Sequence, residues 1–457
     1  MRKRLLTLLA VACLTMHALA DLPFRLYRYE GFKAHDITPE SIVFFGNSIT
    51  NMHEWWEAFG NPHIVNRGVN GAETPIMLEH LDEVLMGHPA KLFLMMGTND
   101  LGTRGMNTPG HVARSVRQAV RRCQEVSPET QIYVQSILPC TTNGIKRVED
   151  VPVTNDSLRR ICQETGVTYV DLYDDLRGIA TYAISKDGTH LTMSGYRTWC
   201  RKIAPLVGAT CTYPDSPSDD DCGLGGISGM RATSFAALPV KQGDILMLGD
   251  DGNDWHELLH SGCVKQRGSS WGPRANTLAD MMKMVPGILH GRADNGEPRA
   301  VCLMLGYAEA AGNEELTMVA RHYEALVRLI RQQAPHAAIK LMAVYPSPTA
   351  SVNASRIKPF NAMLQAMADS MVGVDYVDGT YSRMVKDGVA DTDCFHGIYP
   401  YARGYARLSQ IVAEALGPET GVKPTSEAEV IGRTARIEAR RSRFGQKPDE
   451  SSAAQRH

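Results

Sequence analysis

The sequence predicts an α/β protein of two tandem domains, each a doubly wound, mainly parallel sheet between two layers of helices. Short apolar runs alternate with segments of helical periodicity, which is typical of strand–helix–strand units. The runs IVFF at 42–45 and LFLMM at 92–96 contain no polar residue, so these strands are expected to be buried on both faces, as parallel strands are. The same pattern recurs about 205 residues later, which indicates a duplication.

The first copy supplies these elements in a regular order. Its apolar runs SIVFFG, AKLFLMMG, QIYVQSIL and VTYVDLY predict strands over 41–46, 90–97, 131–138 and 167–173. The segments TPIMLEHLDEVLMG and HVARSVRQAVRRCQEV carry apolar residues at helical spacing and predict amphipathic helices over 74–87 and 111–126. We therefore expect helices to cover both faces of one sheet.

The second copy repeats the first in the same order. The segment DILMLGDDGNDWHELL matches SIVFFGNSITNMHEWW, an alignment that places His256 over His53 and Glu257 over Glu54. Further matches join VCLMLGYAE to LFLMMGTND, VYPSP to ILPCT, and GVDYVDGT to GVTYVDLY. Because the matches keep one order, both halves are expected to share one fold.

Composition marks the ends of the two copies. Residues 1–20 combine a basic start, an apolar stretch and a small-x-small ending, the pattern of a cleaved export signal. A lipoprotein signal is less favoured, because no leucine stands three residues before Cys13. We expect export to the periplasm or the cell exterior. The expected parts are a signal peptide at 1–20, a first domain at 21–208, a linker at 209–230, a second domain at 231–417, and a charged tail at 418–457, in which a surface helix is followed by a disordered segment.

Charge and cysteine usage limit the function classes. Lys and Arg total 48 against 50 Asp and Glu, so the formal net charge of -2 gives no reason to expect a nucleic-acid partner. A small or neutral substrate is expected, with no cofactor. The cysteines lack metal-site spacing, so no metal site and mostly buried structural roles are expected. Cys211 and Cys222 flank an acidic loop and could form a disulfide.

Polar residues with catalytic potential follow the predicted strands of the first copy. In a doubly wound sheet, ligands bind beyond the carboxyl ends of the strands. Ser48 follows the first apolar run, Gly71 lies in NRGVNGAET, and Asn99 follows the strand over 90–97. Asp187 and His190 lie three residues apart in DGTH. A serine nucleophile needs a base, an orienting carboxylate and donors for an oxyanion, and this set supplies all of them.

Together these segments resemble the SGNH (GDSL-type) hydrolase family. The four blocks GNSIT, NRGVNGAET, GTND and DGTH occur in the family's order within about residues 24 to 208. The resemblance implies a serine esterase of flavodoxin-like fold, with Ser48 as nucleophile, His190 as general base and Asp187 orienting it. It also implies an oxyanion hole formed by the backbone N–H of Ser48, the N–H of Gly71 and the side-chain amide of Asn99.

Each of these residues taken singly has a structural explanation. Ser48 could cap a helix, Asn99 and Asp187 could lie in turns, and His190 could be a structural histidine. Their occurrence together favours catalysis. The family usually has Gly-Asp-Ser where this chain has Asn47 before the serine, and we expect that change to affect only local hydrogen bonding.

The second copy is predicted to lack esterase activity. Ser48 aligns with Asp251 and Asn99 with Ala308. Loss of one oxyanion donor raises the activation barrier for ester cleavage by about 2.7–4 kcal/mol. A carboxylate about 4 Å from the developing oxyanion raises it further, by about 4 kcal/mol of repulsion at an effective dielectric of 20.

Asp393 and His396 keep the spacing of a triad in this degenerate second site. The favoured role for His396 is an ion pair with Asp251 that stabilises the remnant cleft. Ligand binding in that cleft is the alternative.

The leading hypothesis is an exported esterase that removes short acyl groups, above all O-acetyl groups of a carbohydrate, from a small-molecule or glycan substrate. It rests on resemblance to the acetylhydrolase and sugar acetylesterase branch of the family. A lysophospholipase or other lipid esterase, and a non-catalytic glycan-binding protein, are the alternatives. His53, Trp55 and Trp56 could line an acyl or sugar pocket, or could pack the first helix on the sheet.

Overall fold

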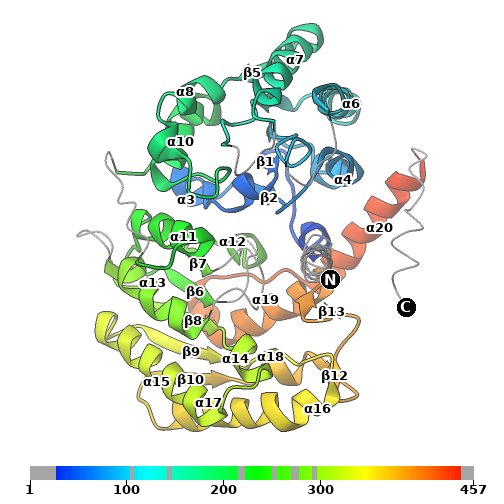
Figure 1. Cartoon of the computed structure of the whole chain (residues 1–457). Helices are drawn as coiled ribbons and strands as arrows, with labels where there is room; N and C mark the ends of the chain where they lie inside the picture. Colours follow the sequence, from blue (N-terminus) through cyan, green and yellow to red (C-terminus); the bar gives the residue numbers. More distant parts are fainter. Residues whose placement is uncertain are drawn as a thin grey trace, which may run out of the picture.

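The computed structural model describes residues 27–102, 108–141, 147–214, 222–249, 255–268, 277–290 and 296–443. In this part of the chain, the main strands form two parallel five-stranded sheets with helices on their faces (Figure 1). The predicted fold class, two tandem doubly wound α/β/α domains, is confirmed. None of the helices described is long and apolar enough to cross a membrane.

The first sheet has the strand order β2-β1-β3-β4-β5, and every pair is parallel. Its strands are β1 (Ile42–Gly46), β2 (Ile64–Gly68), β3 (Lys91–Leu94), β4 (Gln131–Gln135) and β5 (Thr168–Val170). The helices are α2 (Ser48–Asn51), α3 (Trp55–Phe59), α4 (Thr74–Glu79), α5 (Leu81–Leu85), α6 (Pro109–Val126), α7 (Asp150–Thr165), α8 (Tyr173–Arg177), α9 (Ala180–Ala183) and α10 (Met193–Val207). The predicted helix over 74–87 is therefore two helices that meet at His80.

Strand β1 shows why the sheet is covered on both sides. All five of its residues are buried, and successive side chains of a strand point to opposite faces. Val43 and Phe45 belong to one apolar cluster and Phe44 to another. The unbroken apolar run in the sequence thus contributes side chains to the cores on both faces of the sheet.

The second sheet has the equivalent order β10-β9-β8-β6-β7. Its strands are β6 (Ile245–Gly249), β7 (Val264–Gly268), β8 (Ala300–Met304), β9 (Ala338–Met342) and β10 (Val374–Val377). Around it lie α11 (Gly226–Ala237), α12 (Trp255–Leu258), α13 (Leu278–His290), α14 (Tyr307–Ala311), α15 (Leu316–Gln333), α16 (Ala350–Val352), the π-helix η1 (Asn353–Ile357), α17 (Lys358–Asp369), α18 (Gly379–Ser382) and α19 (Ala402–Leu416). Two short hairpins follow β10, formed by β11 (Val385–Lys386) with β12 (Val389–Ala390) and β13 (Phe395–His396) with β14 (Tyr399–Pro400).

Equivalent side chains make equivalent contacts in the two domains. Asn155 accepts a hydrogen bond from the N–H of Ile137 and donates one to its carbonyl, at 2.8 and 2.9 Å. Asn361 does the same to Val344, at 2.8 and 3.1 Å. Each amide satisfies the backbone just beyond the fourth strand of its sheet. These matching details agree with a tandem duplication.

The alignment of His53 and Glu54 with His256 and Glu257 is wrong. Ile64 of β2 pairs with the first residue of β1, and Val264 of β7 pairs with the first residue of β6, so Ile64 and Val264 are equivalent. Counting back from them makes Glu57, not Glu54, the equivalent of Glu257. The reason is loop length: residues 47–54 join β1 to α3, whereas the shorter segment 250–254 joins β6 to α12.

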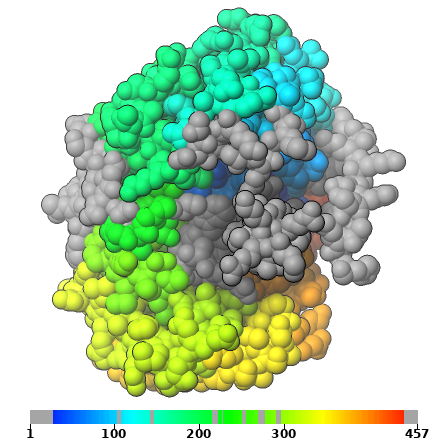
Figure 2. Space-filling model, in the orientation of Figure 1, coloured from blue at the N-terminus to red at the C-terminus, as the bar shows by residue number. Residues whose placement is uncertain are grey.

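The two domains pack together through reciprocal ion pairs. Figure 2 shows the second domain directly against the first. Arg67 of β2 lies 2.8 Å from Glu257, and the equivalent Arg267 of β7 lies 2.7 Å from Glu57. All four side chains are buried or nearly so. Two subunits related by a two-fold axis exchange the same contact in this way. Here the two partners are domains of one chain.

The surface helix expected after about residue 417 is present, over residues 427–443. A short 3-10 helix, η2 (Pro418–Thr420), is followed by α20 (Glu427–Arg443), which packs on α19 and α5. Val430 is buried, and Arg433 donates to Asp36 at 2.8 Å, so the helix returns to the segment before β1. Residues 1–20, the expected signal peptide, lie outside the described residues.

Candidate active site

Strand β1 delivers Ser48 to the edge of the first sheet. The strand ends at Gly46, where a Cβ would lie 2.1 Å from Oγ1 of Thr50, so only glycine fits. Asn47 then caps α2, because its side chain accepts a hydrogen bond from the N–H of Ile49 at 2.9 Å. The cap is therefore Asn47, and the hydroxyl of Ser48 is left for another partner.

Ser48, His190 and Asp187 form a continuous chain of hydrogen bonds. Oγ of Ser48 lies 2.8 Å from Nε2 of His190, and Nδ1 of His190 lies 2.7 Å from Oδ2 of Asp187. The side chain of Ser48 comes from the end of β1, whereas the other two come from one loop before α10. Sequence positions 142 residues apart thus meet at one point.

The loop itself holds Asp187 in an ionised form. Its Oδ1 accepts hydrogen bonds from the N–H groups of Thr189 and His190, both at 2.9 Å, and from the hydroxyl of Ser185 at 2.7 Å. Gly188, with a φ of 80°, permits the turn. Partial burial raises the pKa of Asp187, but the hydrogen bonds from His190 outweigh it and hold the pKa well below its ordinary value.

Gly71 and Asn99 lie on adjoining loops. Nδ2 of Asn99 donates to the carbonyl of Ala72 at 2.8 Å, next to Gly71, whose φ of 69° favours glycine. The neighbouring Asp100 is fully buried and accepts from the N–H and hydroxyl of Thr74, at 3.0 and 2.7 Å. Asp100 thus ties the two loops together at the start of α4.

Sequence reasoning missed this role of Asp100, although the duplication carried a signal for it. The equivalent Glu309 is also acidic, and its Oε1 accepts from the N–H of Leu278 at 2.8 Å. An acidic residue retained at this position in both copies could have indicated a shared structural contact. Burial raises the pKa of both Asp100 and Glu309.

Residues 44–198 and 252–407 each match the GDSL-like lipase/acylhydrolase family. The chain belongs to that family. The match occurs twice, once in each domain, as the duplication requires.

Several solved structures are similar to single GDSL-like domains of the chain. A Streptococcus pneumonia protein described as a platelet activating factor is 24% identical, with a TM-score of 0.38, over 43% of this chain and 99% of its own. A GDSL-like lipase from Bacteroides thetaiotaomicron is 17% identical, with a TM-score of 0.31, over 37% and 88%. A catalytic mutant of an acetylxylan esterase from Geobacillus stearothermophilus is 15% identical, with a TM-score of 0.32, over 38% and 97%. No curated protein matches the chain significantly.

The aromatic residues that follow α2 in the first GDSL-like domain belong to its packing. Trp55 is 1% exposed and stacks on Phe44 at 4.3 Å between ring centroids. Trp56 is also buried, and it stacks on His256 of the second domain. The cavity that both tryptophans border, between the two domains, has a volume of only about 20 Å³, which is too small for an acyl group or a sugar. The packing explanation therefore holds for both.

The possible disulfide between Cys211 and Cys222 is absent from the structure. Cys211 is a free thiol, and a hydrogen bond with Cys200 lowers the pKa of Cys211 to about 7. Sγ of Cys200 in turn lies 3.4 Å from Nε2 of His53, which is buried. His53 thus packs beside Cys200 instead of facing solvent. The packing explanation therefore holds for His53 as well.

The second GDSL-like domain does not reproduce the triad among its described residues. The carboxylate of Asp393 lies 3.7 Å from Arg403, whereas the ring of His396 stacks on Tyr401. In the described part of the chain, no hydrogen bond or ion pair joins Asp393 to His396. Spacing alone was therefore not enough to form the pair. Asp251, its predicted partner, lies outside the described residues.

Proposed function

We propose that the first domain is a serine esterase in which Ser48 is the nucleophile, His190 the general base and Asp187 the orienting carboxylate. The hydrogen-bonded chain from Ser48 through His190 to Asp187 carries this proposal. Membership of an acylhydrolase family supports the reaction class.

The geometry suits two-step acyl transfer. Oγ of Ser48 attacks the ester carbonyl carbon as Nε2 of His190 takes its proton. The N–H groups of Ser48 and Gly71 and the amide of Asn99 stabilise the oxyanion. His190 then gives the proton to the leaving alcohol, and later activates the water that releases the acid. Asp187 stabilises the imidazolium in both steps.

The proposed substrate is a short-chain ester, above all an O-acetyl group on a carbohydrate. The motif blocks that resemble sugar acetylesterases support it. Ser48 is 6% exposed and the side chain of His190 15% exposed, and such narrow access favours a small acyl group. Export, inferred from residues 1–20, is part of the proposal and would bring the enzyme to extracellular or periplasmic glycans.

Hydrolysis of p-nitrophenyl esters of increasing chain length tests this proposal. A preference for acetate, followed by acetate release from a panel of acetylated sialic acids and plant polysaccharides, is the expected result. A preference for long chains would support the lipid esterase instead. Complete inactivity of the folded protein, together with binding to glycans, would support the non-catalytic alternative.

Replacing Asn99 with alanine is expected to lower kcat by about 10²- to 10³-fold with little change in KM, because an oxyanion donor acts mainly in the transition state. Steady-state kinetics on p-nitrophenyl acetate measure the effect. The change Ala308→Gly at the equivalent position of the second domain is the control and should leave kcat unaltered. An equal loss in both variants would contradict the oxyanion role.

Activity is expected to fall on acidification, because only a neutral imidazole at His190 can accept the Ser48 proton. Asp187 remains ionised at neutral pH, since its pKa is lowered in the folded protein. By linkage, Asp187 stabilises the fold above the unfolded-state pKa of about 3.9, and this contribution is lost as the pH falls from that value through the lower folded-state pKa. Measurement of kcat/KM and of the unfolding midpoint against pH tests both points. A kcat/KM that does not fall when the folded enzyme is acidified would exclude His190 as the base.

A further inference from the structure

We propose that Arg231, a residue of the second domain, is a positioning residue for the nucleophile of the first. It holds the end of α2, the four-residue helix that begins at Ser48. Nη1 of Arg231 donates to the carbonyl of Met52, the C-cap of that helix, at 2.8 Å. This inference rests on the proposed esterase function.

Side chains satisfy the carbonyls at the end of α2, which a helix of this length leaves without backbone partners. The hydroxyl of Tyr196 donates to Ile49 at 2.7 Å. Further donations run from Trp55 Nε1 to Thr50, from Asn66 Nδ2 to Asn51 and His53, and from Arg231 to Met52. The first three donors come from the first domain. Arg231 is thus the donor that the second domain adds to this set.

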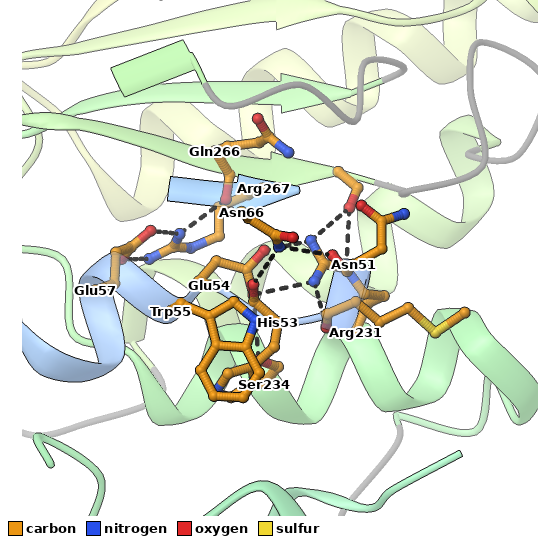
Figure 3. Close-up of polar contacts among 12 residues, drawn as sticks. Asn51, His53, Glu54, Trp55, Glu57, Asn66, Arg231, Ser234, Gln266 and Arg267 are labelled. Atoms are coloured by element: carbon orange, nitrogen blue, oxygen red, sulfur yellow. Dashed lines mark hydrogen bonds and ion pairs between the residues drawn. The ribbon is translucent and has the colours of Figure 1, made fainter. Parts of the chain in front are cut away.

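Arg231 is itself held in place. Its guanidinium pairs with both carboxylate oxygens of Glu54, one of them at 3.0 Å, and it donates to the carbonyl of Gly268 at 3.2 Å (Figure 3). The hydroxyl of Ser234 lies 3.3 Å from the same carboxylate. The side chains of Arg231 and Glu54 are 3% and 8% exposed. A buried, two-point ion pair of this kind fixes the donor that reaches Met52.

A neighbouring ion pair, Arg267 with Glu57, also joins the two domains but does not contact α2. Arg267 pairs with both oxygens of Glu57, at 2.7 and 2.8 Å, and is equally buried (Figure 3). Arg267 also bonds its own strand, at the carbonyl of Gln266. Its contacts fix α3 against β7, whereas those of Arg231 reach the segment that starts at Ser48. The two pairs therefore provide a matched comparison.

The consequence for catalysis follows from the length of α2. One turn of helix separates Met52 from Ser48, so displacement of the Met52 carbonyl shifts the serine relative to His190. Misplacement of a reacting group by about 1 Å can cost on the order of 10²-fold in rate. The second domain, which lacks a triad among its described residues, thereby acts on the active site of the first.

The experiment compares two double variants of the full chain, Arg231→Met with Glu54→Gln, and Arg267→Met with Glu57→Gln. The Arg231 variant removes both charges of its pair and leaves neither partner unpaired. The Arg267 variant also takes from Lys265 the carboxylate that lies 3.5 Å from its ammonium, so it disturbs the interface at least as much and is a stringent control. The readouts are kcat and KM on p-nitrophenyl acetate, and the rate at which a fluorophosphonate probe labels Ser48. All are measured at a temperature where circular dichroism shows both variants folded. The Arg231 variant should lose about 10- to 100-fold in kcat and in labelling rate, with KM nearly unchanged. The Arg267 variant should stay within about threefold of the parent protein.

Equal effects in the two double variants, or a parent-like labelling rate in the Arg231 variant, would overturn the inference. If the Arg231 double variant does not fold, Arg231→Lys replaces it and is compared with Arg267→Lys. The lysine keeps the charge but cannot bind Glu54 and Met52 in the same fork, so an intermediate rate is expected, and a parent-like one overturns the inference. An unmodified protein that the probe does not label would instead refute the proposed function itself.

Discussion

The variant Ser48→Ala is expected to lose about 10⁴- to 10⁶-fold in kcat on p-nitrophenyl acetate, because no other group can form the acyl intermediate. The fold should survive. The Ser48 hydroxyl contacts His190, whereas the turn around it is fixed by Asn47 and by the carbonyl contacts of α2. Kinetics and a thermal unfolding curve, measured on the same sample, test both halves of this prediction.

The matched control is His396→Ala, in the second domain. His396 stacks on Tyr401 and belongs to no triad among the described residues, so its removal should leave kcat near that of the parent. A folded Ser48→Ala protein with full activity would rule out the nucleophile. Loss of activity in His396→Ala but not in Ser48→Ala would move the reaction to the second domain.

The variant Asp187→Asn is expected to lose about 10⁴-fold in kcat. An amide at this position can still accept from the N–H groups of Thr189 and His190, so the loop should keep its shape. It cannot stabilise the imidazolium that forms when His190 takes the serine proton, and it favours the wrong tautomer of the ring. Steady-state kinetics across the neutral pH range measure the loss.

Asp393→Asn is the corresponding control, because Asp393 has the same spacing to a histidine but lies near Arg403. Its kcat should equal that of the parent. A loss below about tenfold in Asp187→Asn would show that His190 does not depend on this carboxylate. The pair of variants therefore separates a triad defined by contacts from one defined by sequence spacing.

The second strand of each sheet shows where sequence patterns were insufficient. Strands β2 and β7 read IVNRG and VKQRG, so neither forms an apolar run that predicts a buried strand. Every residue of β2 is nevertheless buried. The side-chain amide of Asn66 donates to carbonyls at the end of α2, and the guanidinium of Arg67 donates to Glu257 of the other domain. Polar residues can occupy a buried strand here because distant parts of the chain complete their hydrogen bonds.

The apolar runs that form β1, β3 and β4 could be recognised without a structure, because burial on both faces imposes a pattern within each segment. Ser48, Asp187 and His190 could be selected as candidates as well, since they lie in short motifs that occur in the family's order.

The sequence by itself thus determined the duplicated α/β fold, the family resemblance and the residues around which a serine esterase can be proposed. Only the tertiary structure decided that Glu57 is the equivalent of Glu257, that Asp393 and His396 form no pair, and that Arg231 reaches Met52. The physical reason is that a motif is defined by residues adjacent in the sequence. A buried ion pair is defined by residues from distant parts of the chain, which come together only when the two domains pack.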